Sequence, residues 1–299
     1  MRRFVVIGMT VAIAAGLSAC SSSSKPASSG TTPNTTAPAS TSGACGSAPK
    51  PAEAANFTPV APGTLSVVTS LPGPGFMNTS NNDPTKVTSG YEYDIAKCLA
   101  ADFGLPKLSI RNVGFDAIEA GTVTHYDIEL SQMSITAKRA KVLSFSTPYF
   151  ESQQGILMRK GDSVATLAEA KKLKWGVETA TTAIDLLKSI GVDNPHSYQS
   201  LTDAYTALQA KQIDAVLIDT AINLGQAARS NGELHVPAQF NQPGGPDHYG
   251  AALPKGSQNL AAVDAVFKSL KDSGELTKLV NKDLTADPGT IPVIQVPSS

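Results

Sequence analysis

The chain has 299 residues, of which 41% are hydrophobic and 16% are charged, and its formal net charge is −1. This length and composition suit a globular protein with one large domain or two modest ones. Because the charge is nearly balanced, the composition excludes the strong basic field that attracts nucleic acid or anionic membranes, and we expect no nucleic-acid partner.

The N-terminus has the features of an export signal. Arg2 and Arg3 precede an apolar run at residues 4–17, which has the length of a signal peptide and is too short to span a bilayer comfortably. The run ends in the residues LSAC, which resemble the bacterial lipobox. This resemblance implies that residues 1–19 are removed and that Cys20 carries a lipid that anchors the protein to the outer face of the cell membrane. The alternative is an ordinary secretory signal with a chance cysteine.

Residues 20–56 are rich in Ser, Thr, Pro and Ala and contain almost no large apolar side chain. Such a segment buries too little surface to offset the entropy lost on ordering it. We therefore expect a flexible tether between the lipid anchor and a domain that begins near Phe57.

Two cysteines remain when Cys20 is assigned to lipid. In an exported protein an even pair favours a disulfide, so we predict a bond between Cys45 in the tether and Cys98 in the domain. The alternative is that Cys98, on one helical face with Ile95, is a small buried thiol and that Cys45 stays reduced.

Between residues 57 and 287, short apolar runs alternate with amphipathic helical ones. This pattern is typical of α/β layering with parallel strands. Strands are predicted at residues 64–69, 108–113, 126–132, 174–179, 214–219 and 249–254. The clearest helices are predicted at residues 91–105, with a stop signal at Gly104, and at residues 257–274, which begin at a Ser cap.

Polar and basic residues gather at the carboxyl end of the predicted strand 126–132. Thr136 is placed to cap a short helix with the sequence AKRAKVL, so residues 131–136 lie where open α/β sheets bind ligands. A helix start, its N–H groups and Arg139 one turn later together form a receptor for a carboxylate. The alternative is a solvated helix face, which is the commoner meaning of such a basic cluster.

A second helix start and one acidic residue extend this interpretation. Thr181 and Thr182 follow the predicted strand 174–179 and offer hydroxyl and N–H groups at a helix N-terminus. Asp219 ends the apolar strand 214–219, where it is either a simple helix cap or the counter-charge for an ammonium group. A site for an anion together with a site for a cation matches the carboxylate and ammonium groups of an α-amino acid.

Six segments of the chain follow one another in an informative order: GYEYDIAKCLAADFGL, FDAIEAG, YDIELSQMSITAKRAKVLSFSTPYF, WGVETATT, IDAVLIDT and YGAALPKGSQNL. In this order they resemble the bacterial extracellular solute-binding proteins of the amino-acid class, family 3, over about residues 63–284. The resemblance implies a type II periplasmic-binding fold, in which two α/β lobes joined by two crossing strands close on a ligand. The crossings are expected near residues 152–156 and 249–253.

The resemblance also implies domain boundaries and partners. Lobe 1 comprises residues 57–153 and 250–287, lobe 2 comprises residues 154–249, and residues 288–299 form a C-terminal tail. The implied partners are a small-molecule amino acid and the permease and ATPase of an ABC importer. A monomer without a cofactor or metal is expected.

The binding positions of the family carry over to this sequence residue by residue. Arg139 matches the arginine that grips the ligand carboxylate, and Asp219 matches the aspartate that takes the ammonium group. The other matches are Ser134 for a hydroxyl residue, Thr182 with Thr181 beside it for a backbone N–H of the second lobe, Phe115 for an aromatic on the ligand body, and Phe76 at the entrance.

Three positions leave the side-chain preference of the site open. Ala180 replaces the usual glycine before the paired threonines, and Gln132 stands where a small residue is common. Glu178, at the end of the strand 174–179, favours a basic or amide-bearing ligand if it projects into the cleft. Its alternative is a surface acid on the edge of a lobe.

Other classes of function have less support in the sequence. The four histidines show no metal-ligand spacing and no GxSxG motif is present, so we expect no enzymatic activity. Some relatives of the fold are dehydratases, a role in which Glu178 would act as the acid or base. A third class is a receptor that reports the ligand to a signalling partner, which the polypeptide does not distinguish from a transport protein.

Overall fold

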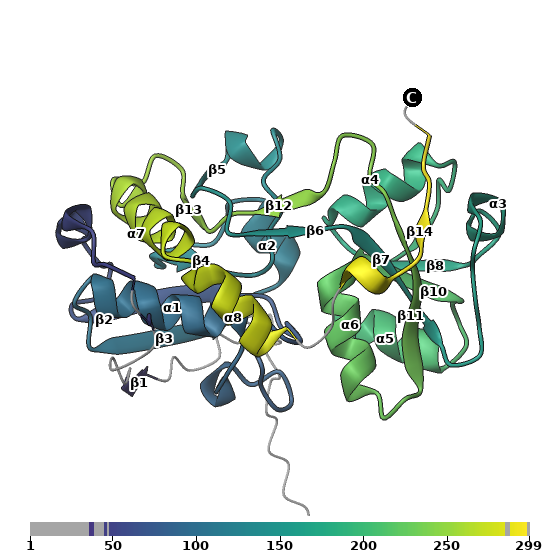
Figure 1. Cartoon of the computed structure of the whole chain (residues 1–299), viewed down its shortest axis with the longest axis horizontal. Coiled ribbons are helices and arrows are strands. Elements are labelled where there is room, and N and C mark those ends of the chain that lie inside the picture. The colour runs from purple at the N-terminus through teal and green to yellow at the C-terminus, as the bar shows by residue number, and fades with distance from the viewer. Residues whose placement is uncertain (1–35, 39–44, 47, 285–287, 298–299) are drawn as a thin grey trace, which may run out of the picture. The chain divides into compact units, whose positions relative to one another are not determined.

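The computed structural model describes residues 36–38, 45–46, 48–284 and 288–297. The predicted signal peptide and the lipidation site at Cys20 lie outside these described residues. Two six-stranded sheets carry the helices, and a two-stranded ribbon runs between the sheets (Figure 1). Each sheet with its helices forms one lobe.

The sheet of lobe 1 has the strand order β1-β3-β2-β4-β13-β5. Its strands are β1 (Thr36–Pro38), β3 (Lys107–Asn112), β2 (Thr64–Thr69), β4 (Ile128–Glu129), β13 (Ala252–Pro254) and β5 (Leu143–Phe145). β2 pairs in parallel with β3 and β4, whereas β13 runs antiparallel to β4 and β5. The late strand β13 lies among early ones, so lobe 1 is built from two separate parts of the chain.

Helices of lobe 1 follow the predicted apolar stripes. They are α1 (Tyr91–Asp102), α2 (Phe115–Glu119), α7 (Leu260–Asp272) and α8 (Glu275–Asp283), with the 3-10 turns η1 (Ala52–Asn56), η2 (Pro84–Lys86) and η3 (Arg139–Lys141). The stripe of α1 is fully buried at Ile95 and Leu99, and the helix stops before Gly104, whose φ of +70° suits a residue without a Cβ. α7 begins later than predicted, because Asn259 is its N-cap residue.

The sheet of lobe 2 has the strand order β14-β11-β7-β10-β8-β9. Its strands are β14 (Val293–Ile294), β11 (Leu234–Phe240), β7 (Gln154–Arg159), β10 (Ala215–Asp219), β8 (Trp175–Glu178) and β9 (His196–Tyr198). Its helices are α3 (Leu167–Ala170), α4 (Thr182–Ser189), α5 (Leu201–Gln209) and α6 (Thr220–Arg229). β10 lies inside the sheet and is buried along its whole length, which accounts for its continuous apolar sequence.

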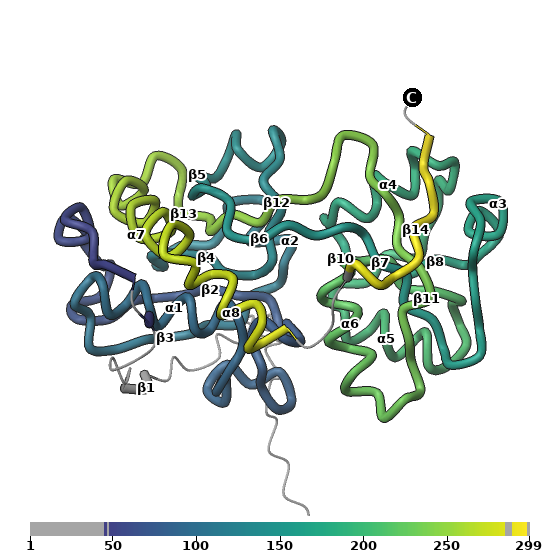
Figure 2. The backbone as a smooth tube through the Cα atoms, viewed as in Figure 1, coloured from purple at the N-terminus to yellow at the C-terminus, as the bar shows by residue number. Residues whose placement is uncertain are grey.

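The ribbon between the lobes consists of β6 (Phe150–Ser152) and β12 (Asp247–Tyr249), which pair antiparallel. These are the two crossing strands, and each begins two residues before its predicted position at 152–156 or 249–253. The backbone trace shows both strands passing between the sheets (Figure 2).

Two terminal segments differ from the sequence prediction. The predicted tether ends earlier than residue 56, because η1 places Ala54 in the core of lobe 1 with 1% of its surface exposed. The predicted C-terminal tail contributes β14, which pairs in parallel with β11. Ile294 and Val296 are buried in the core of lobe 2, so burial of these two side chains fixes the segment.

The predicted strand 126–132 and the helix after it are both shorter than expected. Only Ile128–Glu129 pairs as a strand, and Gln132 has a φ of +53°, which ends extended backbone. Instead of a helix, Arg139–Lys141 form a single 3-10 turn, in which Thr136 Oγ1 accepts a hydrogen bond from Arg139 N at 3.2 Å. No α-helix begins at residues 136–142, so in this segment the guanidinium group of Arg139 is the group that could receive a carboxylate.

Candidate functional site

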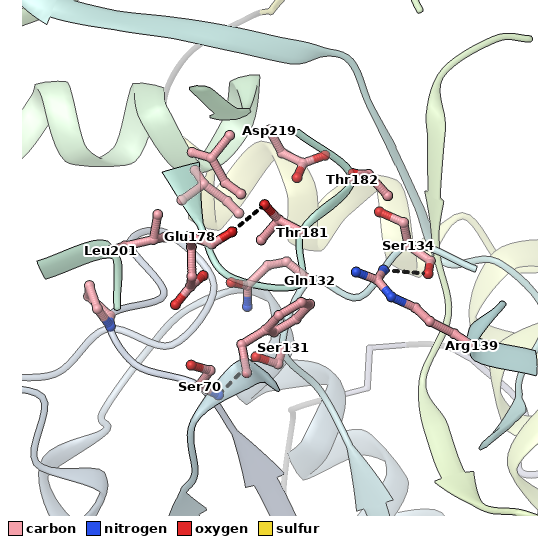
Figure 3. A pocket seen from close by; sticks show the side chains of 14 residues that line it. Ser70, Ser131, Gln132, Ser134, Arg139, Glu178, Thr181, Thr182, Leu201 and Asp219 are labelled. Atoms are coloured by element: carbon pink, nitrogen blue, oxygen red, sulfur yellow. Dashed lines mark hydrogen bonds between the residues drawn. The ribbon is translucent and has the colours of Figure 1, made fainter. Parts of the chain in front are cut away.

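A pocket between the two lobes collects side chains from the carboxyl ends of several strands (Figure 3). Its lining residues are Ser70, Pro72, Phe115, Ser131, Gln132, Ser134 and Arg139 from lobe 1, and Glu178, Thr181, Thr182, Leu201, Ile218, Asp219 and Ile222 from lobe 2. Both lobes therefore contribute to one site, at the edge of the sheets where α/β proteins bind ligands.

Arg139 is the one basic residue among these lining residues, and its side chain is almost completely buried, with 3% exposed. Nη1 donates to Ser134 O at 2.7 Å, Nη2 donates to Ala180 O at 2.9 Å, and the guanidinium carbon lies 5.2 Å from the centre of the Phe115 ring. The neighbouring Lys138 side chain is 78% exposed. The solvated-face alternative is thus wrong for Arg139, although it describes Lys138.

The second helix start is present as predicted. α4 begins at Thr182, Thr181 is its N-cap residue, and Ala180 has a φ of +67°. Thr181 Oγ1 donates to Glu178 O at 2.7 Å, and Thr182 Oγ1 lies 3.1 Å from Asp247 Oδ2. The hydroxyl groups are thus used within the protein, which leaves the N-terminal N–H groups of α4 as the donors for an anion.

Asp219 is the acidic residue at the start of α6. It occupies the N-cap position, but its side chain makes no capping hydrogen bond, so the simple-cap alternative lacks its defining contact. Only 3% of the residue is exposed, and Oδ1 has no hydrogen-bond partner among the described residues. Burial and the nearby Asp247 carboxylate raise the pKa of Asp219 well above its usual value. A cation in the pocket would relieve both effects.

Glu178 and Gln132 form another part of the pocket wall, and both point into the pocket in Figure 3. Glu178 is 6% exposed, so it is not the surface acid of the alternative interpretation. Burial raises its pKa to about 8, while a hydrogen bond from the backbone of Leu201 opposes this shift. Gln132 is also 6% exposed.

The structure does not place every predicted residue at the site. Phe115 and Ser134 line the pocket, but Phe76 does not. Phe76 is fully buried in lobe 1, where its ring packs edge-on against Tyr91, Phe150 and Tyr249. Its position in the loop after β2 suggested an entrance role, whereas this aromatic cluster draws the side chain into the core.

Six lining residues were missing from the sequence prediction: Ser70, Pro72, Ser131, Leu201, Ile218 and Ile222. Ser70 directly follows the predicted strand 64–69, and Ser131 lies at the end of the predicted strand 126–132, within the segment 131–136 already placed at a ligand-binding edge; this position is the signal that would have identified both. Ser70 N donates to Ser131 Oγ at 2.8 Å, which joins these two strand ends. The apolar members carried no such signal, because Ile218 and Ile222 are also typical core residues of a strand and a helix.

Residues 66–285 match the family model of the bacterial extracellular solute-binding proteins, family 3. The chain belongs to this family. The match covers both lobes and every lining residue of the pocket, and it stops before the C-terminal strand β14.

Relatives of this family 3 protein include binding proteins for different amino acids. The ABC transporter glutamine-binding protein GlnH of Bacillus subtilis is 28% identical over 221 residues, which cover 72% of this chain and 78% of the relative. The crystal structure of the amino acid ABC transporter substrate-binding protein AbpA from Streptococcus pneumoniae, bound to L-arginine, is similar with a TM-score of 0.65 and 26% identity. That similarity covers 74% of this chain and 94% of AbpA.

One relative carries the name of an enzyme. The membrane-bound lytic murein transglycosylase F of Desulfosudis oleivorans is 27% identical over 66% of this chain, but the match covers only 44% of the transglycosylase. The similarity to that enzyme is therefore confined to less than half of its length.

The described residues of the family 3 protein contain no group of three or more His, Cys, Asp or Glu side chains that could hold a metal ion. No helix among them combines the length and apolar character needed to cross a membrane.

Cys45 and Cys98 lie next to each other but are held as thiols. Cys98 is fully buried on α1. A hydrogen bond with Cys45 is the main cause that raises the pKa of the Cys98 thiol, and burial is the second cause. Their contact favours the predicted disulfide, and the bond itself stays a prediction.

Proposed function

We propose that this protein is an extracytoplasmic lipoprotein that captures an α-amino acid and delivers it to an ABC importer. Family membership supports solute binding, and the names of the relatives support amino acids as the solute. The observation that carries the proposal is that Arg139 and Asp219, both of them buried, line the same pocket. An ion pair with each end of a zwitterion compensates the burial of both protein charges.

The carboxylate of the ligand binds Arg139 and the N-terminal N–H groups of α4. The guanidinium group has five N–H donors, of which two are used by Ser134 O and Ala180 O, and its Nε lies 4.0 Å from Glu119 Oε1. The other Nη hydrogens remain for an anion. The ammonium group binds Asp219, whose Oδ1 has no hydrogen-bond partner in the described part of the chain. In this mode the ligand contacts lobe 1 and lobe 2 together.

The side chain of the ligand is polar, basic or amide-bearing. Glu178 and Gln132 supply polar groups in the same pocket as Arg139 and Asp219, while Leu201, Ile218 and Ile222 pack around the aliphatic part. The glutamine-binding protein of B. subtilis and the L-arginine complex of S. pneumoniae AbpA agree with this class of ligand.

A ligand panel tests the function directly. The purified wild-type protein should bind at least one basic or amide-bearing amino acid in isothermal titration calorimetry. The decarboxylated and deaminated analogues of that ligand should not bind, because each removes the charged ligand group that contacts the buried Arg139 or Asp219. If no amino acid binds, or if both analogues bind as well as the parent, the proposal is wrong.

Membrane attachment has its own test. The sequence LSAC supports lipidation at Cys20, with the mature protein as a monomer on the outer face of the membrane. Cys20→Ala should leave the precursor unacylated and move the protein out of the membrane fraction. Unchanged acylation would show that Cys20 is not the anchor.

A further inference from the structure

The buried carboxylate of Glu92 binds Gln132, a lining residue of the ligand pocket, at two points. Glu92 lies in the first turn of α1 and is completely buried. Its Oε1 accepts a hydrogen bond from the backbone N–H of Gln132 at 2.7 Å, and its Oε2 accepts one from the side-chain Nε2. Tyr149 also donates its hydroxyl hydrogen to Oε1.

These contacts fix which end of the Gln132 amide faces Glu92. A primary amide has two donors on nitrogen and an acceptor oxygen, whereas an ionised carboxylate only accepts. Burial raises the pKa of Glu92 to about 7, and the hydrogen bonds from Tyr149 and Gln132 oppose this shift, so the carboxylate is ionised above that pH. The NH₂ group must therefore turn toward Glu92, and the oxygen Oε1 must turn away. No described residue donates a hydrogen bond to Gln132 Oε1, so this acceptor is available on a residue that lines the pocket.

The backbone around the amide leaves it little freedom. Gln132 has a φ of +53°, a conformation that residues with a side chain rarely adopt, and its hydrogen bond to Glu92 stabilises it. On another side lies Gly73, where a Cβ atom would stand only 3.3 Å from Gln132 Nε2 and 3.4 Å from Oε1. Gly73 thus packs directly against the amide group.

We infer that Glu92 is a positioning residue for ligand selectivity: it holds the Gln132 amide with its oxygen toward the ligand, so that the pocket favours a ligand side chain with a hydrogen-bond donor. This inference rests on the proposed function and narrows its ligand class. An amide NH₂, ammonium or guanidinium group satisfies Gln132 Oε1. A carboxylate at the same point meets an acceptor and leaves both groups without a hydrogen.

The variant Glu92→Gln reverses the orientation while keeping the shape of the side chain. The new amide oxygen must accept from Gln132 N and the Tyr149 hydroxyl, which places the new NH₂ group toward the side chain of Gln132. Only the oxygen of Gln132 can receive it, so the Gln132 amide turns and presents its own NH₂ to the pocket. Selectivity should then shift toward acceptor side chains.

The test uses two pairs of ligands that have nearly the same shape, glutamine with glutamate and arginine with citrulline. Calorimetry gives the ratio of dissociation constants within each pair for wild type and variants. We expect the wild type to prefer glutamine over glutamate, and Glu92→Gln to shift this ratio at least about tenfold toward glutamate, the size expected for one unpaired buried acceptor. In a Gln132→Ala background, Glu92→Gln should cause no further shift.

Glu129→Gln is the matched control. Glu129 is also completely buried in lobe 1, but its carboxylate oxygens have no hydrogen-bond partner among the described residues and so do not orient the Gln132 amide; Glu129→Gln should leave the ratio unchanged. The inference is overturned if the wild type prefers glutamate, if folded Glu92→Gln keeps the wild-type ratio within about twofold, or if Gln132→Ala does not suppress the shift. If the wild type binds none of the four amino acids, the proposed function itself has failed.

Discussion

Arg139 Nη2 donates a 2.9 Å hydrogen bond to the carbonyl oxygen of Ala180, and this bond joins lobe 1 to lobe 2 at the ligand pocket. A second contact across the lobes brings α6 against the loop after β2: a Cβ atom on Gly225 would stand 2.6 Å from Pro74 O. A ligand that touches both lobes adds contacts only when they are together, so binding should shift the protein toward this closed arrangement.

Gly225→Ala should therefore weaken ligand binding without touching the ligand. The added methyl group cannot fit against Pro74 unless the lobes separate, so we expect about a tenfold loss of affinity, as for a mild overpacking. Alanine is the better helix former, so α6 itself should not suffer. Calorimetry measures the affinity of the variant for the ligand, and small-angle scattering measures closure of the lobes. Gln226→Ala on the same helix is the control, and unchanged affinity in Gly225→Ala would argue against closure through this contact.

Glu178 should make the binding of a cationic ligand depend on pH. Burial raises its pKa from 4.5 to about 8, so the folded protein favours the neutral carboxyl group. Without ligand, stability from this group is complete below pH 4.5 and is lost as the pH rises toward about 8. Arginine binds the ionised carboxylate of Glu178, so the affinity of the protein for arginine should rise as the pH increases from 4.5 to about 8. Glu178→Gln should flatten the stability profile, and should remove most of the pH dependence of arginine binding; an unchanged slope would show that another group titrates.

Cys45 and Cys98 should form a disulfide in the exported protein. Alkylation of the unreduced mature protein should leave both residues unmodified, and mass analysis should find them linked. The bond closes a loop of about 50 residues, for which chain entropy predicts about 4 kcal/mol of stabilisation. Reduction should accordingly lower the midpoint of thermal unfolding. Two alkylated thiols in protein prepared from an oxidising compartment would refute the pairing.

The C-terminal strand β14 should stabilise lobe 2. Ile294 is 4% exposed and packs in the core of that lobe, so Ile294→Ala should lower the free energy of unfolding by about 2 to 5 kcal/mol. Val293 lies on the same strand but is 47% exposed, and Val293→Ala should cost less than about 1 kcal/mol. Urea denaturation measures both. Equal effects would mean that β14 does not pack as described.

The strands and helices that could be predicted are those whose pattern is local. The stripe of α1 with Gly104 after it, and the apolar run of β10, were recognisable because burial of one face or both faces leaves its period in the sequence. β14 was not recognisable, since two residues that pair with a distant strand have no period of their own.

The site divides in the same way. Arg139 and Asp219 could be named because charged residues follow recognisable strands and match a family motif. Phe76 was misplaced and Glu92 was missed, because their roles depend on partners that lie far along the chain, Tyr249 for one and Gln132 for the other. Likewise, the positive φ of Gln132 ends the strand before it earlier than predicted. The sequence gives no sign of this turn, because the residue at this position is not a glycine.

The central claim is that Arg139 and Asp219 bind the two charges of one amino acid, and calorimetry on two alanine variants tests it most directly. Arg139→Ala and Asp219→Ala, each checked for intact folding by circular dichroism, should weaken binding of the ligand found in the panel by about 3 to 5 kcal/mol, or two to four orders of magnitude in dissociation constant. The exposed neighbour Lys138 provides the control, and Lys138→Ala should bind as the wild type does. If Arg139→Ala instead binds within about threefold of the wild type, less than about 1 kcal/mol, the ligand carboxylate lies elsewhere and the account is contradicted.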